Sequence, residues 1–87
     1  MFDYIKLKHI ILKYYKNQCV QIILQGVVNT TFFFKDVKVL IDRRKLIFSD
    51  NEYVNFIIDL DYIEKIKILN EFHIRFFYKD LMIDIQQ

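Results

Sequence analysis

Three adjacent cations, Arg43-Arg44-Lys45, are the densest group of chemically capable side chains in this chain of 87 residues. On a projecting loop, such a group contacts nucleic-acid phosphates or an acidic protein surface. The same run is also typical of a solvated hairpin loop, because surface charge usually needs no partner. Three further cations precede it on an expected helix: Lys6, Lys13 and Lys16. If helix and loop share one side of the molecule, these six residues form one partner- or nucleic-acid-binding site.

The other chemically capable residues lie singly or in pairs. Asp59 and Asp61 share one face of an expected strand and have the composition of an acid-base or metal-binding pair. A strand end is usually solvated surface, so we do not expect catalysis there. His9, His73 and Cys19 lack the spacing of metal ligands. The sequence therefore predicts no catalytic site, no metal and no cofactor, and a protein that is not an enzyme.

Two aromatic runs, Phe32-Phe33-Phe34 and Phe76-Phe77-Tyr78, place rings on both faces of expected strands. Rings exposed beside cations stack on unpaired bases or anchor a protein interface. Rings that point inward fill the core instead, and a domain of this size needs nearly all its aromatic side chains inside. Core packing is therefore the simpler interpretation of most of these rings.

The charges divide unevenly along the chain. Residues 1–45 contain nine Lys and Arg against three Asp, whereas residues 46–87 contain four against eight Asp and Glu. The formal balances are +6 and −4. A surface with that asymmetry steers association with charged partners. It also permits self-assembly, in which the basic half of one copy meets the acidic half of the next.

Composition indicates one domain spanning residues 1–87. Hydrophobic residues make up 54% of the chain and aromatic residues 17%, which is typical of a folded core rather than a disordered chain. Cys19 is the only cysteine, so it has no partner for an internal disulfide and fits a reducing compartment. No apolar run is long enough for a transmembrane helix, and the start of the chain is unlike a signal peptide. We therefore expect a cytoplasmic protein.

The spacing of apolar residues predicts an N-terminal helix over about residues 3–16. Leu7, Ile11 and Tyr14 recur at intervals of three and four residues, while lysines occupy another face. Asp3 is in position to cap this helix. The helix would therefore present one apolar face to a sheet and one basic face to its surroundings.

The period changes to two in the strand region, about residues 18–85. Short connections between the apolar runs predict five to seven antiparallel strands in a curled sheet or a small barrel. Gly26 predicts a bulge or bend before a strand that begins at Val27. Two polar runs predict a hairpin loop and a turn: Asp42-Arg43-Arg44-Lys45 and Ser49-Asp50-Asn51-Glu52. A strand from Tyr53 to Ile58 follows the turn.

The segment that follows is ambiguous. Asp61-Tyr62-Ile63-Glu64 has the form of a capping box and predicts one helical turn, with Ile63 and Ile66 directed inward. A strand beginning at Ile66 and a helix spanning residues 62–70 both fit the short apolar run there. Both interpretations stay open from the sequence.

Part of the strand region resembles the bacterial PH-like and GRAM-like small β-barrel domains, over about residues 37–77. The run from Val39 to Phe48 is similar to their strand-turn-strand with a basic turn and a closing aromatic residue. The run from Ile57 to Ile66 resembles the strand that follows and ends in an Ile-x-x-Ile corner. The resemblance implies a small β-barrel-like fold, and no function is carried over from it.

Overall, the fold class is α+β and mostly β, with one N-terminal helix. The first functional hypothesis is a small non-enzymatic protein-binding module, an adaptor or inhibitor that occludes a partner's surface, conceivably encoded by a phage or mobile element. The alternative is a nucleic-acid-binding domain that uses the basic N-terminal half. A further alternative is a self-assembling structural protein. We expect a protein partner, with nucleic acid and a homo-oligomer as the other outcomes.

Overall fold

The structure, a computed structural model, describes residues 4–26, 29–50 and 55–87. Within these ranges the chain forms one α-helix, eight strands and a single 3₁₀ turn. The elements are α1 (Tyr4–Tyr14), β1 (Val20–Gln25), β2 (Thr30–Phe34), β3 (Lys38–Asp42), β4 (Lys45–Ser49), β5 (Asn55–Asp59), η1 (Leu60–Tyr62), β6 (Lys65–Asn70), β7 (His73–Tyr78) and β8 (Leu81–Gln86).

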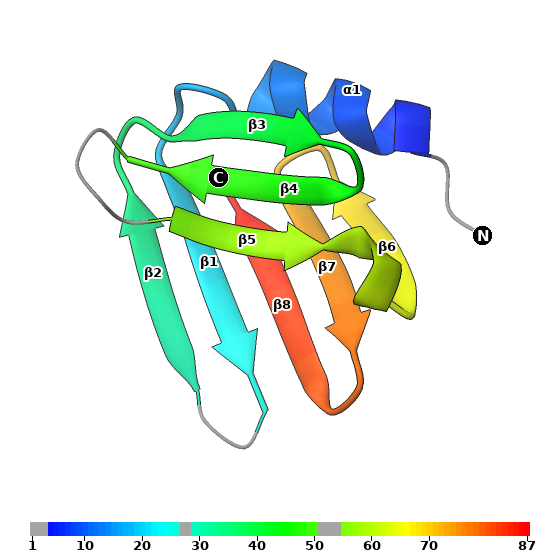
Figure 1. Ribbon diagram of the computed structural model, residues 1–87. Helices are drawn as coiled ribbons and strands as arrows, with labels where there is room; N and C mark the ends of the chain where they lie inside the picture. The colour runs from blue at the N-terminus through cyan, green and yellow to red at the C-terminus, as the bar shows by residue number, and fades with distance from the viewer. Residues whose placement is uncertain (1–3, 27–28, 51–54) are drawn as a thin grey trace.

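The strands form two antiparallel sheets that pack face to face. One sheet has the order β2-β1-β8-β7-β6, and the other has the order β3-β4-β5. Figure 1 shows β3, β4 and β5 crossing in front of the five-stranded sheet, with strand directions steeply inclined to one another. The predicted fold class, a mostly antiparallel β-structure after an N-terminal helix, is confirmed. The described residues form eight strands rather than five to seven, and these strands do not close into a barrel.

Of the ambiguous segment over residues 62–70, Lys65–Asn70 forms a strand, β6, rather than a helix. Ile66 and Ile68 lie half-buried on the inner face of β6, and Lys65 and Lys67 lie exposed on its outer face. This alternation fits a strand paired with β7, and a helix would break the pairing.

The expected helical turn is the short turn η1, which overlaps the first two residues of the predicted capping box. Its cap is Asp59, whose Oδ1 accepts a hydrogen bond of 3.0 Å from Asp61 N–H. Ile63 is buried after the turn and Ile66 is half-buried, so both are directed inward as expected.

Several sequence-based expectations concern residues outside the described ranges. These are the Asp3 cap, the start of a strand at Val27, part of the turn at Asn51-Glu52, and the start of a strand at Tyr53. The expected bend is found at Gly26, directly after β1. An added Cβ there would lie 3.1 Å from the carbonyl oxygen of Asp80, so glycine permits a close approach to the β7–β8 turn.

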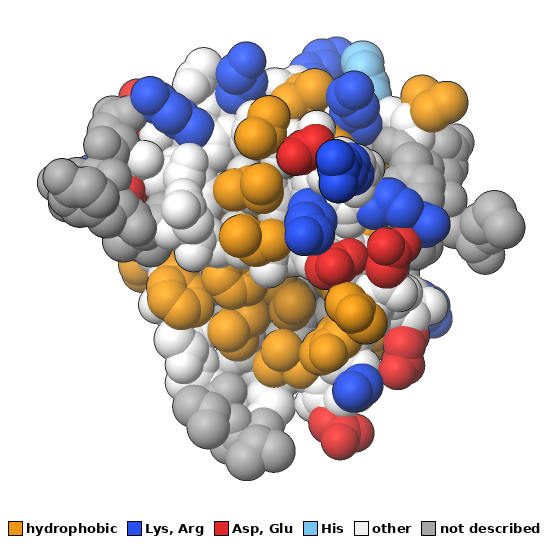
Figure 2. All heavy atoms as spheres, viewed as in Figure 1, with side chains coloured by type: hydrophobic (Ala, Val, Ile, Leu, Met, Phe, Trp, Pro, Cys, Tyr) orange, Lys and Arg blue, Asp and Glu red, His pale blue; other side chains and the backbone are white. Residues whose placement is uncertain are grey.

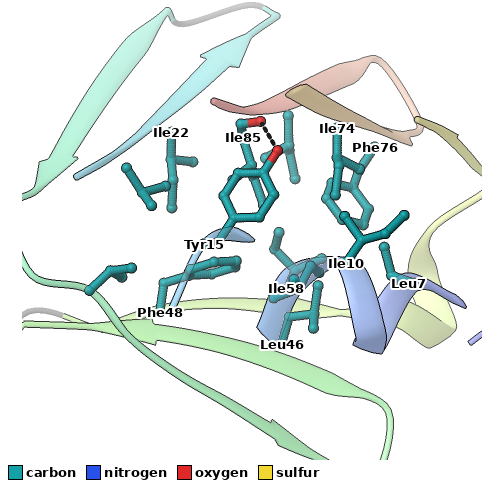
Figure 3. Packing of buried hydrophobic residues seen from close by; sticks show 14 of the residues in the cluster. Leu7, Ile10, Tyr15, Ile22, Leu46, Phe48, Ile58, Ile74, Phe76 and Ile85 are labelled. Atoms are coloured by element: carbon teal, nitrogen blue, oxygen red, sulfur yellow. Dashed lines mark hydrogen bonds between the residues drawn. The ribbon is translucent and has the colours of Figure 1, made fainter. Parts of the chain in front are cut away.

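Helix α1 contributes Leu7, Ile10 and Ile11 to the core between the sheets. Tyr15 follows the helix and is fully buried, and its hydroxyl donates to the carbonyl oxygen of Ile85 at 3.3 Å (Figure 3). Burial raises the pKa of the Tyr15 hydroxyl, so the group stays neutral and keeps this hydrogen bond. The helix therefore closes one end of the space between the sheets.

Burial decreases from this closed end toward the opposite end of the five-stranded sheet. Along the inner face of β1, Ile22 is fully buried but Leu24 is only partly buried. Along β8, Ile85 is fully buried but Leu81 is only partly buried. Figure 1 shows why, since β3, β4 and β5 cross the upper part of the five-stranded sheet and leave its lower part uncovered.

Candidate functional site

The predicted basic residues lie on α1, just after its end, and at the turn between β3 and β4. Arg43 and Arg44 form the tight turn between β3 and β4, and they line a cleft of about 480 Å³ together with Lys8 of α1. Sequence reasoning did not select Lys8. Lys13 lies in the last turn of α1, over the ring of Tyr14 at 5.3 Å. Lys6 is also exposed on α1, and Lys16 is exposed after its end.

Acidic side chains are interleaved with the basic turn. Arg44 Nε lies 2.9 Å from Asp61 Oδ1. Lys45 stands between Asp42 of β3 and Asp59 of β5 in the strand register. The pairing of β4 with β5 therefore brings residues from the basic half of the sequence beside residues from the acidic half. Such an arrangement weakens attraction for a phosphate backbone at this corner.

A second cleft of about 300 Å³ lies at the end opposite α1, and we call it the open-end cleft. It lies between β5 and the uncovered part of the five-stranded sheet. Its lining is apolar and aromatic except for one carboxylate: Leu24, Phe56, Ile57, Ile58, Asp59, Tyr62, Ile63, Tyr78, Leu81 and Ile83. Figure 2 shows the same feature as a band of hydrophobic side chains across the centre of this face.

The free edge of β5 forms one wall of the open-end cleft. Four consecutive residues of β5, Phe56 to Asp59, line the cleft although their side chains alternate between two faces. Such a run can border one cleft only if the edge of the strand faces it. Within the described residues β5 is the last strand of its sheet.

Aromatic rings frame the open-end cleft. Tyr62 and Tyr78 meet edge to face with centroids 6.3 Å apart, and Phe32 and Phe56 meet at 5.6 Å. Tyr62 is 63% exposed, which leaves most of its ring in solvent. An exposed tyrosine above an apolar floor is typical of protein-binding surfaces.

The outer face of the five-stranded sheet is polar at its centre. Asp84 is 1% exposed, and its Oδ1 accepts hydrogen bonds from Arg75 Nε at 2.7 Å and from His73 Nε2 at 3.0 Å. Burial alone would raise the pKa of Asp84, but these hydrogen bonds and the charge of Arg75 outweigh burial and lower the pKa. The neighbouring carboxylate in turn raises the pKa of Arg75. This cluster holds β7 and β8 together.

Exposed rings and cations surround that polar centre. Phe33 of β2 is 75% exposed. Lys65 Nζ lies 5.7 Å from the ring centroid of Phe77, and Lys67 lies opposite Arg75 in the register of β6 and β7. One ring of each aromatic run predicted from the sequence thus lies on the outer face, while Phe34 and Phe76 fill the core.

Comparison of the chain with protein-family models, curated proteins and solved structures gave no match. The resemblance of residues 37–77 to PH-like domains therefore stays a prediction. Within the described ranges, no helix has the length and apolar character needed to cross a bilayer.

Sequence reasoning missed the residues of the open-end cleft. Tyr62 was noted only as part of a helical turn and Asp59 only as half of a carboxylate pair, and Leu81 was not singled out. Tyr62 and Leu81 come into the cleft because β8 lies beside β7 and η1 follows β5. The sequence offers one signal for this cleft. The apolar strand that contains Ile57 is followed by a short turn that contains Tyr62.

Proposed function

We propose that this protein is a small, non-enzymatic protein-binding module that acts inside the cell by occluding a partner's surface. The open-end cleft is the observation that carries this proposal. It is an apolar groove with aromatic rims on a face where the neighbouring β5 edge has no paired strand within the described residues. The single cysteine, Cys19, is an exposed free thiol and fits a reducing compartment.

Occlusion needs a rigid surface rather than reactive groups. Most lining residues of the open-end cleft belong to strands, and two of them, Ile58 of β5 and Ile83 of β8, are themselves buried in the core. A preorganised apolar groove binds with little loss of conformational entropy. An adaptor or inhibitor of this size therefore gains affinity from a few well-placed contacts.

The proposal is tested by quantitative affinity capture with matched variants. The immobilised baits are the wild type, the cleft variants Tyr62→Arg and Leu81→Asp, and the control Leu69→Asp, which changes an exposed leucine on β6. We expect one partner protein to be retained by the wild type and the control and lost by both cleft variants. Titration of that purified partner then measures affinity, and its own binding or catalytic activity should fall as the complex forms.

Two results would contradict this function. The first is that the cleft variants retain every captured protein as well as the wild type does. The second is that the purified partner binds without any change in its own activity. Circular dichroism and urea unfolding of each bait exclude misfolding as the cause of a lost interaction.

The outer face of the five-stranded sheet supports a second candidate, binding of single-stranded nucleic acid. Phe33 and Phe77 offer rings for base stacking, and Lys65, Lys67 and Arg75 offer cations for phosphates. Among the described residues that the strand register places on this face, Asp84 is the only acid, and Arg75 is paired with it.

Fluorescence anisotropy with labelled single- and double-stranded DNA and RNA separates this candidate from the first. Binding to single strands should weaken with salt, with Phe33→Ala and with Lys67→Ala. The triple substitution Arg43→Ala/Arg44→Ala/Lys45→Ala tests the basic turn in the same assay. No binding even at low salt eliminates the nucleic-acid function.

A further inference from the structure

One backbone hydrogen bond shows in which direction the N–H and C=O groups of each β5 residue point. Leu60 N–H donates to the Arg44 carbonyl at 2.8 Å, which continues the register of β4 with β5. In an antiparallel pair, the N–H and C=O of one residue point to the same side, and successive residues alternate. Phe56 and Ile58 therefore pair with β4. The N–H and C=O of Ile57 point away from β4, toward the open-end cleft.

Two features that favour binding therefore lie side by side at β5. The edge of β5 presents backbone donors and acceptors, and the groove beside it presents apolar surface. A small apolar molecule would satisfy only the groove, and a folded polar surface would satisfy only the edge. An extended backbone with alternating side chains satisfies both, because it pairs with the edge and turns every second side chain into the groove.

We propose that an extended segment of a partner protein adds to the free edge of β5 as a further strand, with its alternate apolar side chains in the open-end cleft. This inference rests on the proposed protein-binding function and specifies how the partner is recognised. Backbone hydrogen bonds to Ile57 supply affinity, and the cleft supplies selectivity for the side chains.

The outer face of the three-stranded sheet indicates which side chains the segment carries at the positions that do not enter the cleft. One cross-strand row alternates in charge: Asp42, Lys45, Asp59. The next row is aliphatic: Leu40, Ile47, Ile57. A strand beyond β5 continues both rows best with Lys or Arg beside Asp59 and a β-branched residue beside Ile57. The segment runs antiparallel to β5, and its successive residues are then basic, apolar, β-branched and apolar.

A second copy of this chain does not fit the same edge. Two copies paired antiparallel through β5 are related by a two-fold axis perpendicular to the three-stranded sheet. That axis places the five-stranded sheets of both copies in one layer. The uncovered part of each five-stranded sheet projects beyond β5 (Figure 1), so the two projections would overlap. The occupant is therefore a single strand with no second layer beneath it.

The test uses a synthetic peptide, acetyl-Thr-Lys-Leu-Val-Leu-Thr-amide, designed to place Lys beside Asp59 and Val beside Ile57. In the paired arrangement the Val N–H points to the carbonyl of Ile57, and the N–H groups of both leucines point away. N-methylation of Val removes the hydrogen bond and keeps every side chain. N-methylation of the second Leu is the matched control.

Binding is measured by calorimetry, and amide hydrogen exchange of the protein is followed by NMR. We expect the peptide to slow exchange of the Ile57 amide, which is exchange-competent in the free protein. We expect N-methyl-Val to weaken binding at least about tenfold and N-methyl-Leu to change it less than about threefold. Tyr62→Arg and Leu81→Asp should abolish binding, and Leu69→Asp should leave it unchanged.

The inference is overturned if the peptide binds equally well with N-methyl-Val, or if binding leaves the Ile57 amide unprotected. If the designed peptide does not bind, peptides are selected from a displayed library of random sequences. The inference is also overturned if no selected peptide slows exchange of the Ile57 amide. A cleft-dependent dimer in sedimentation would show that a second copy covers the edge, again against the proposal. In each case a partner captured through the cleft leaves the protein-binding function standing.

Discussion

The two ends of the space between the sheets differ in what closes them. At one end, α1 inserts Leu7, Ile11 and neighbouring side chains, and Tyr15 reaches the carbonyl of Ile85. At the other end, β5 is the last strand of the three-stranded sheet among the described residues, and Leu24 and Leu81 stay partly exposed. The same kinds of aliphatic side chain therefore contribute to stability at one end and are available for binding at the other.

The difference teaches that the location of an apolar residue, rather than its type, decides its role. Ile11 and Ile57 are both isoleucines on regular elements, yet Ile11 is fully buried and Ile57 is 56% exposed. Burial of an aliphatic side chain contributes about 1.5–3 kcal/mol. Ile11 makes this contribution on folding, whereas Ile57 is able to make it only when a partner covers it.

The largest expected effect is at the closed end. Ile11→Ala removes fully buried methyl groups beneath α1 and should lower the free energy of unfolding by about 2–5 kcal/mol. The measurement is the urea midpoint at constant slope. The control is Leu12→Ala on the exposed side of the same helix, for which we expect a loss below about 1 kcal/mol. Equal losses in the two variants would mean that the helix does not close the core.

The next effect concerns Asp84, on the outer face between the two ends. Asp84→Asn removes the carboxylate that holds Arg75 and His73, and should cost about 1–3 kcal/mol at neutral pH. The pKa of Asp84 is lower in the folded than in the unfolded state. Its ionised form therefore adds stability that is complete above the unfolded pKa of about 3.9 and is lost as the pH falls through the folded pKa.

Urea unfolding at neutral pH and near pH 3 checks the sign of this dependence. The wild type should lose more stability in acid than Asp84→Asn does. Asp61→Asn, at an exposed ion pair, is the control and should keep the acid dependence of the wild type. An unchanged acid dependence in Asp84→Asn would assign it to other carboxylates.

A smaller effect on stability is expected at the open end. Tyr62→Ala removes a ring that is 63% exposed and meets Tyr78 edge to face, so the cost should be about 0.5–1 kcal/mol. The same variant should lose binding at the cleft. Thermal unfolding and peptide titration on one sample compare the two effects. A stability loss as large as that of Ile11→Ala would show that the open end is part of the core.

The smallest effect is expected at the basic turn. Arg44→Ala breaks the ion pair with Asp61, in which both side chains are more than half exposed. Exposed pairs contribute little, so the change should be below about 0.5 kcal/mol and should shrink further in high salt. Urea unfolding at low and high salt measures it. A larger, salt-insensitive loss would indicate that Arg44 supports the chain turn between β3 and β4 through its other contacts.

Local pattern was enough for most of the fold. Alternation of polar and apolar residues marked β1, and helical spacing marked α1, because one face of each element is buried. The choice between strand and helix at Ile66 and Ile68 was not decidable locally. Pairing with β7 settled it, since a short apolar run satisfies either period until it has a neighbour.

The candidate site was harder to predict than the fold. Arg43, Arg44 and Lys45 stand out in the sequence, but the fold surrounds them with acids that are distant along the chain, among them Asp61. The residues of the open-end cleft have no motif. Most are ordinary core-type side chains that form a surface because β5 is the last strand of its sheet in the part of the chain that the structure describes.

The sequence by itself determined the class of fold and most of the secondary structure, because the period of apolar residues indicates which face of each element is buried. Only the tertiary structure decided which end of the core stays open and which charges meet. Strand order and sheet coverage depend on contacts between residues far apart in the chain, such as Gln21 with Gln86. Those contacts place Leu81 and Ile57 beside one cleft, and no local pattern carries that information.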